Sequence, residues 1–381
     1  MISAFAIILN EDILYCSDKE KYNLFESILF VEKLMKSINN IWRLDCIYFQ
    51  DRDNNKGNEE RILIKHIVTE KGDNLFYCIS GDFNPSSQES YKMLSEYQKK
   101  VEQFYPDPES LLKPSKRSMM EEVIGVKTDF LKIQYNDKLK SEEIRNKISP
   151  TEYPYIKENK LLYCGLSTQG LPIISKLYNA EFFDNLDENA DEEMIEVFCS
   201  KLSAKLATIA MNTTIRAQTN VKEIFIRDLN NTKHKIIILY GNINNYSLDF
   251  VSYGNLTQFY KVFHRLKQEL SQEEILNKDF SGDLNPFRHL SKYLSNLTGF
   301  LCPRDDKAFV IWRDDCAPCI YHIGEHIDDI EADCDFPDIH WGQGDREKWV
   351  EIKKNRRFDK KYGKFSGRVI EDKGNAFDSH I

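Results

Sequence analysis

The chain has 381 residues and a mass of 44.8 kDa, enough for two or three domains that each bury a core. Hydrophobic residues make up 41% and charged residues 30%, so wholesale disorder and fibrous repeats are excluded. A formal charge of -9 argues against a surface that embraces nucleic acid throughout, although it allows a local basic patch. Every apolar run is too short for a membrane-spanning helix.

The first 106 residues predict alternating strands and helices. Apolar residues alternate within the strand candidates, whereas Leu24, Ile28, Val31, Met35 and Ile38 recur at intervals of four and three, the period of one helix face. The expected order is a hairpin, a helix, a three-stranded meander and a second helix. These elements span residues 4–9, 13–16, 22–38, 43–49, 61–69, 74–80, and from the N-cap candidates Ser86 and Ser87 to just before Pro106.

The same order returns after a boundary segment. Residues 107–154 are rich in charge and proline and predict a connector, extended or helical, between two domains. In the second domain, residues 155–274, a helix over 192–210 is expected to bury one apolar face formed by Met194, Phe198, Leu202, Leu206 and Ile209. The other expected elements are strands at 160–166, 171–178, 221–228, 235–242 and 247–253 and a closing helix at 256–270.

Together these patterns predict an α+β protein with two antiparallel five-stranded sheets, each with its helices packed on one face. Residues 275–345 are expected to form a small Cys/His-containing α/β extension, and residues 346–381 a basic tail. The element order over residues 1–106 and 155–274 resembles the longin and roadblock superfamily. This resemblance rests on the order of elements and not on a motif.

The resemblance implies a function in protein interaction. Longin and roadblock modules are non-enzymatic platforms of vesicle trafficking and GTPase regulation, so we expect an adaptor or scaffold whose partner is a small GTPase or another longin-like subunit. A ligand sensor with a PAS-like or profilin-like sheet is the alternative within the same architecture. The sequence contains no phosphate-binding loop, nucleophile elbow or metalloprotease motif, in agreement with a non-enzymatic role.

The cysteines are of two kinds. Five stand singly in apolar stretches, as small hydrophobic residues do, which favours a reducing cytoplasm; they are Cys16, Cys46, Cys78, Cys164 and Cys199. The other four lie near the C-terminus, where Cys316 and Cys319 form a Cys-x-x-Cys pair that can chelate zinc. The candidate ligands are Cys302, Cys316, Cys319, Cys334, His322 and His326. Because no second clean pair completes the site, reduced cysteines in a small core are the competing interpretation, in which the protein has no cofactor.

A basic stretch follows this cluster. Residues 346–368 carry ten basic and three acidic groups with aromatic rings between them, a pattern that can bind anionic lipid or RNA. The candidate contacts are Lys353, Lys354, Arg356, Arg357, Lys360, Lys361 and Lys364. With the Cys/His cluster, this stretch supports a further alternative, a metal-binding protein associated with nucleic acid, while a solvated tail is the simplest interpretation.

Overall fold

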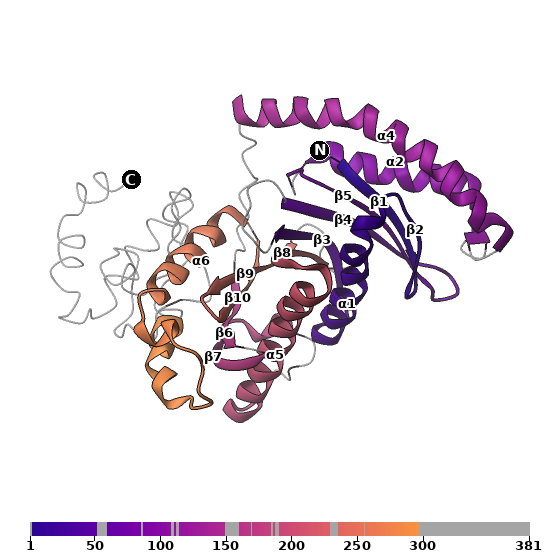
Figure 1. The fold of residues 1–381 in the computed structure, drawn as a ribbon. Helices are drawn as coiled ribbons and strands as arrows, with labels where there is room; N and C mark the ends of the chain where they lie inside the picture. The colour runs from indigo at the N-terminus through magenta and orange to yellow at the C-terminus, as the bar shows by residue number, and fades with distance from the viewer. Residues whose placement is uncertain are drawn as a thin grey trace, which may run out of the picture.

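The computed structural model describes most of residues 2–297. The residues outside this description are 1, 52–58, 85–86, 108–109, 112–113, 149–159, 169, 184–185, 187–189, 229–234, 255, 296 and 298–381. The rest forms two modules with the same order of elements, joined by a long helix (Figure 1).

The first module follows the predicted order closely. Helix α1 buries Leu24, Ile28, Val31, Met35 and Ile38, the face that its sequence period predicted. Helix α2 begins after Ser87, whose hydroxyl oxygen accepts a hydrogen bond from the Ser90 N–H at 3.1 Å. The elements are β1 (Ile2–Leu9), β2 (Asp12–Cys16), α1 (Tyr22–Ile38), β3 (Trp42–Asp51), β4 (Glu59–Val68), β5 (Asn74–Gly81) and α2 (Gln88–Phe104).

The second module repeats this order. Asp191 caps α5 by accepting a hydrogen bond from the Met194 N–H at 2.8 Å, and the helix extends seven residues beyond the predicted end at residue 210. The elements are β6 (Lys160–Thr168), β7 (Leu171–Leu177), α5 (Glu192–Ala217), β8 (Thr219–Asp228), β9 (Lys235–Ile243), β10 (Tyr246–Tyr253) and α6 (Leu256–Leu270). Short helical turns at 274–277 and 285–290 and α7 (Ser291–Ser295) follow.

The prediction of two separate five-stranded sheets is wrong. The strands form one ten-stranded antiparallel sheet in the order β2-β1-β5-β4-β3-β8-β9-β10-β6-β7. Each module contributes five adjacent strands, and the second module repeats the strand order of the first in reverse. The two modules are therefore related by a pseudo-two-fold axis through the β3–β8 pair. The individual strands were predictable from the sequence. The pairing of β3 with β8 was not, because the edge of a strand carries no distinctive sequence signal.

Paired β-bulges flank this axis. In β3 the register skips Asp45 between Leu44 and Cys46, and in β8 it skips Lys222 between Glu223 and Val221. Asp45 is 1% exposed, and it accepts hydrogen bonds from Arg227 of β8 at 2.5 Å and from the Tyr91 hydroxyl of α2 at 2.8 Å. The bulge in β3 therefore places the Asp45 carboxylate where it links β3 to β8 of the second module and to α2.

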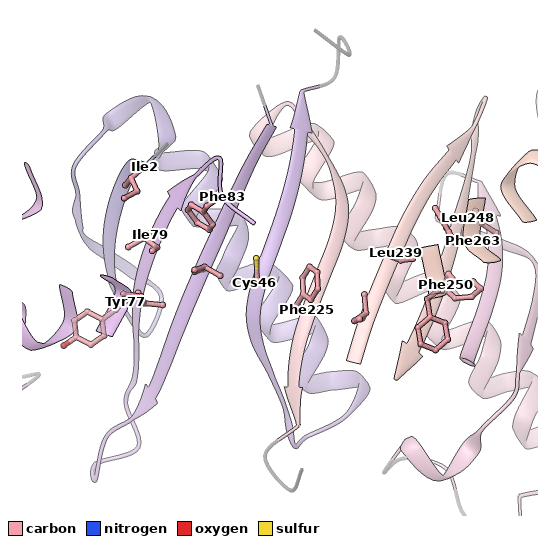
Figure 2. Packing of buried hydrophobic residues seen from close by; sticks show 14 of the residues in the cluster. Ile2, Cys46, Tyr77, Ile79, Phe83, Phe225, Leu239, Leu248, Phe250 and Phe263 are labelled. Carbon is pink, nitrogen blue, oxygen red and sulfur yellow. The ribbon is translucent and has the colours of Figure 1, made fainter. Parts of the chain in front are cut away.

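The prediction that the helices share one face is also wrong. Helices α1 and α5 pack on one face of the sheet, over a cluster that contains Ile47 and Ile224. Helices α2 and α6 cover the other face, where the apolar cluster runs without interruption from the first module to the second. Figure 2 shows this continuity, with Cys46 of β3 and Phe225 of β8 side by side at the seam. The inner strands therefore bury both of their faces, which explains why several of them are continuously apolar.

The connector contains a 35-residue helix, α4 (Pro114–Ile148). Met120, Ile124, Leu131, Tyr135 and Leu139 form its buried face, which joins the cluster on the α2 side of the sheet. Helix α4 lies along the outer side of α2 (Figure 1) and also contacts β1 and β2. Part of the segment predicted as a connector thus belongs to the helical layer of the first module.

A substitution at the seam tests whether the modules are stabilised together. Ile224 is fully buried opposite Ile47, so Ile224→Ala is expected to reduce the free energy of unfolding by about 2–5 kcal/mol. Hydrogen exchange should then lose protection in β5 as well as in β10, because the sheet is continuous. Val68→Ala, at a position 54% exposed, is the matched control and should change stability by less than about 0.5 kcal/mol. Loss of protection confined to the second module would contradict a shared core.

Candidate partner-binding surface

Helices α1 and α5 lie side by side on one face of the sheet, across the β3–β8 seam (Figure 1). Their contact is partly polar: the Lys205 ammonium donates to the Ser37 carbonyl at 2.6 Å, and the Arg216 guanidinium lies 5.7 Å from the centre of the Phe30 ring. The two helices come from different modules, so the seam is what brings them together. They form one composite surface.

A groove opens along this surface. It has a volume of about 630 Å³ and lies between the end of α1 and the first half of α5. Apolar and charged side chains alternate along it, because α5 turns Met194 and Val197 outward beside Lys201 and Lys205. Burial, with the neighbouring Lys201 ammonium, lowers the pKa of Lys205. The groove combines apolar contacts with charge, as protein-binding surfaces do.

The outward side of α5 is unusually apolar. Met194, Val197, Met211 and Ile215 are 47%, 46%, 42% and 68% exposed. The helical period predicts Met194 on the buried face with Phe198 and Leu202, and this prediction is wrong. Helix α5 carries apolar residues on two sides, and a helical period alone cannot say which side the sheet covers.

Buried charges near this surface are held by local partners. Glu32 of α1 accepts the Leu44 N–H at 3.0 Å, and the Nδ1 atom of His66 lies 3.3 Å from its other oxygen. Burial alone would raise the pKa of Glu32, but His66 and the Leu44 N–H favour the carboxylate and hold this pKa below its usual value. Glu32 thereby anchors α1 to β3 and β4. The Lys36 ammonium also lies 3.4 Å from the carboxylate, and because Leu44, His66 and Lys36 all belong to the fold, we assign Glu32 a structural role.

A second buried carboxyl lies beneath α5. Asp249 of β10 is fully buried between Gly165 of β6 and Tyr240 of β9, with the Ser247 hydroxyl 3.0 Å from one oxygen. Burial raises the pKa of Asp249 to about 7, although the bond from Ser247 opposes this shift. A Cβ at position 165 would collide with the Tyr163 hydroxyl, so a side chain there would force the buried Tyr163 ring to move. Asp249, Tyr163 and Tyr240 are all buried. A substrate in solution could not reach this cluster.

The predicted C-terminal sites lie outside the described residues. This holds for the zinc candidates Cys302, Cys316, Cys319, Cys334, His322 and His326 and for the anion-binding candidates Lys353, Lys354, Arg356, Arg357, Lys360, Lys361 and Lys364. Within the described part of the chain, no group of three or more His, Cys, Asp or Glu residues is arranged to hold a metal ion. Of the five single cysteines, Cys46, Cys78, Cys164 and Cys199 are buried and unpaired by disulfides, as their apolar surroundings predicted.

No protein-family model matches the chain, and no curated protein matches it. In the ranges that the structure covers, no helix combines the length and the apolar composition needed to cross a bilayer.

The buried carboxyl makes stability depend on pH. The folded pKa of Asp249 is about 7, whereas an unfolded Asp has a pKa of about 3.9, so between these values the unfolded chain loses a proton that the folded chain keeps. Wild-type stability should therefore fall as pH rises from 4 to 7. Asp249→Asn removes this term, so its stability relative to the wild type should increase by on the order of 2–4 kcal/mol over that range. Urea unfolding at several pH values measures this difference.

Asp137→Asn, at an exposed position on α4, is the control for a general charge effect. The pH dependence of its stability is measured beside that of Asp249→Asn. A difference between Asp249→Asn and the wild type that stays constant with pH would show that the Asp249 carboxyl titrates alike in the folded and unfolded chains.

Proposed function

We propose that this chain is a non-enzymatic adaptor or regulator that binds a protein partner, built from two longin/roadblock-like modules. The observation that carries the proposal is the composite surface of α1 and α5, where exposed apolar side chains and a groove lie over a seam between modules. Contiguous exposed apolar side chains with charged neighbours are typical of protein interfaces. The repeated element order supports the choice of superfamily.

The pairing of β3 with β8 bears on the class of partner that we propose. Longin and roadblock modules commonly pair with another such module, and here β3 of one module already pairs with β8 of the other. In this proposal the second module takes the place of a separate longin-like subunit. A small GTPase is then the partner that the superfamily resemblance favours, and α1 and α5 would contact it together. The proposed location is the cytoplasm, in agreement with the reduced, buried cysteines.

A ligand sensor is the second candidate, since the groove volume of 630 Å³ falls in the range of small-molecule sites. Its lining favours a protein instead. Asp191, Glu193, Lys201 and Lys205 all border the groove, so much of a small apolar ligand would face charge rather than an apolar wall.

The test begins with a pull-down by the full chain from the source cell's lysate, with and without added guanine nucleotide, followed by mass spectrometry. Enrichment of a small GTPase would support the proposal. Its affinity for the purified chain is then measured by calorimetry. Ile215→Glu and Val197→Glu place a charge at exposed apolar positions of α5 and should each weaken binding by about 30-fold or more.

Leu284→Glu is the matched control, because Leu284 is 46% exposed and precedes the helical turn at 285–290, whose buried Phe287 and Leu290 belong to the cluster on the opposite face of the sheet. It should bind like the wild type. If the α5 variants and the control bound the GTPase equally well, the surface would be wrong. If no GTPase were enriched with or without the added guanine nucleotide, the partner class would be wrong.

A further inference from the structure

Helix α4 carries a second apolar stripe, opposite the face that it buries. Met119, Val123, Val126, Phe130 and Ile133 recur at intervals of four, three, four and three, the a/d spacing of a two-stranded coiled coil. Four of them are strongly exposed: Met119 at 57%, Val126 at 69%, Phe130 at 57% and Ile133 at 74%. Val123 is half-buried.

This stripe is separate from the face that packs α4 onto the first module, where its Phe130 ring lies 5.9 Å from the Lys100 ammonium of α2. The buried face of α4 is formed by Met120, Ile124, Leu131 and Tyr135, which join the core on the α2 side of the sheet. At 3.6 residues per turn, the exposed stripe lies about 150° around the helix from that face. The protein body therefore lies behind α4, and a second helix can approach the stripe without meeting it.

We propose that α4 pairs in parallel with α4 of a second copy of this chain, through Met119, Val123, Val126, Phe130 and Ile133. The two-fold axis would run along the helices, and each seam residue would meet its own counterpart. The proposal concerns the face of the sheet opposite α1 and α5 and does not rest on the proposed function.

The charges that flank the stripe select the parallel orientation. One flank carries Glu122 and Asp129, and the other carries Lys127 and Gln134. The spacing puts Val123 and Phe130 at a positions and Met119, Val126 and Ile133 at d positions. In a parallel pair, the residue just before each a position faces the residue five places further along the partner helix, so Glu122 faces Lys127 of the second copy. Asp129 then faces a neutral Gln134. An antiparallel pair would instead place acidic flank against acidic flank and Lys127 near its own counterpart.

The seam also has a defined end. The next position of the stripe is Asp137, followed by Lys140, and in a parallel pair each would meet a like charge. The contact is therefore confined to about two heptads, between Met119 and Ile133. A seam of this length gives a small interface, so we expect a reversible dimer with a dissociation constant on the order of 1–100 μM.

Sedimentation velocity of the full chain over a range of concentrations tests the association. The wild type should shift from monomer to dimer across the micromolar range. Val126→Glu and Ile133→Glu place charges in the seam and should each weaken dimerisation by about 100-fold or more. Ile144→Glu changes a residue that is 58% exposed on the same helix, beyond the charged break, and should dimerise like the wild type.

Charge exchange tests the orientation. Glu122→Lys alone and Lys127→Glu alone should each weaken the dimer by about five-fold, because each places like charges together twice in a symmetric pair. The double variant restores both contacts and should return to the wild-type dissociation constant. Equal weakening by all three would overturn the parallel assignment.

Cross-linking provides an independent measure of orientation. With a short bismaleimide, Ile133→Cys should link to itself more strongly than the wild-type background does. Met119→Cys mixed with Ile133→Cys should give no added hetero-link. The reverse result would overturn the parallel pair. A chain that stays monomeric at the highest attainable concentration, or that associates equally well with Glu at positions 126 and 133, would overturn the proposal as a whole.

Discussion

The pairing of β3 with β8 is the contact on which the rest of this structure depends. It joins five strands from each module into one sheet and makes the apolar clusters on both faces continuous. An open edge strand is a liability, since its unpaired N–H and C=O groups invite other chains, and each module covers the edge of the other. The buried Asp45 carboxylate, bonded to Arg227 across the seam and to Tyr91 above it, adds a polar tie that favours this register.

The same contact creates the surfaces that can bind partners. By placing the modules about a pseudo-two-fold axis, it brings α1 and α5 together on one face and leaves α2 and α6 on the other. The composite α1–α5 surface, with its groove and exposed apolar residues, exists only because of this arrangement. Helix α4 has no counterpart in the second module among the described residues, so the face it covers departs from the pseudo-symmetry. Two distinct interaction surfaces thus lie on opposite faces of a single sheet.

The buried polar groups show how the fold tolerates charge in its interior. Glu32 is kept ionised by a backbone N–H and by His66, whereas Asp249 has one hydroxyl partner and a pKa near neutrality. The first arrangement stabilises the carboxylate at physiological pH, and the second costs stability as pH rises. Glu32 belongs to α1 and faces β3 and β4, and Asp249 lies beneath α5. Both carboxyls therefore lie on the sheet side of the helices that form the candidate surface.

By itself the sequence determined the elements and their order, because apolar periods of two and 3.6 residues are set locally by the strand and the helix. The buried face of α1, the capping by Ser87 and the repeated order were all predictable in this way. Only the tertiary structure decided that the modules share one sheet and that Met194 faces outward, since edge pairing and the choice between two apolar helix faces depend on contacts far apart in the chain. For the same reason, the candidate site emerged where two modules meet, at residues that form no motif.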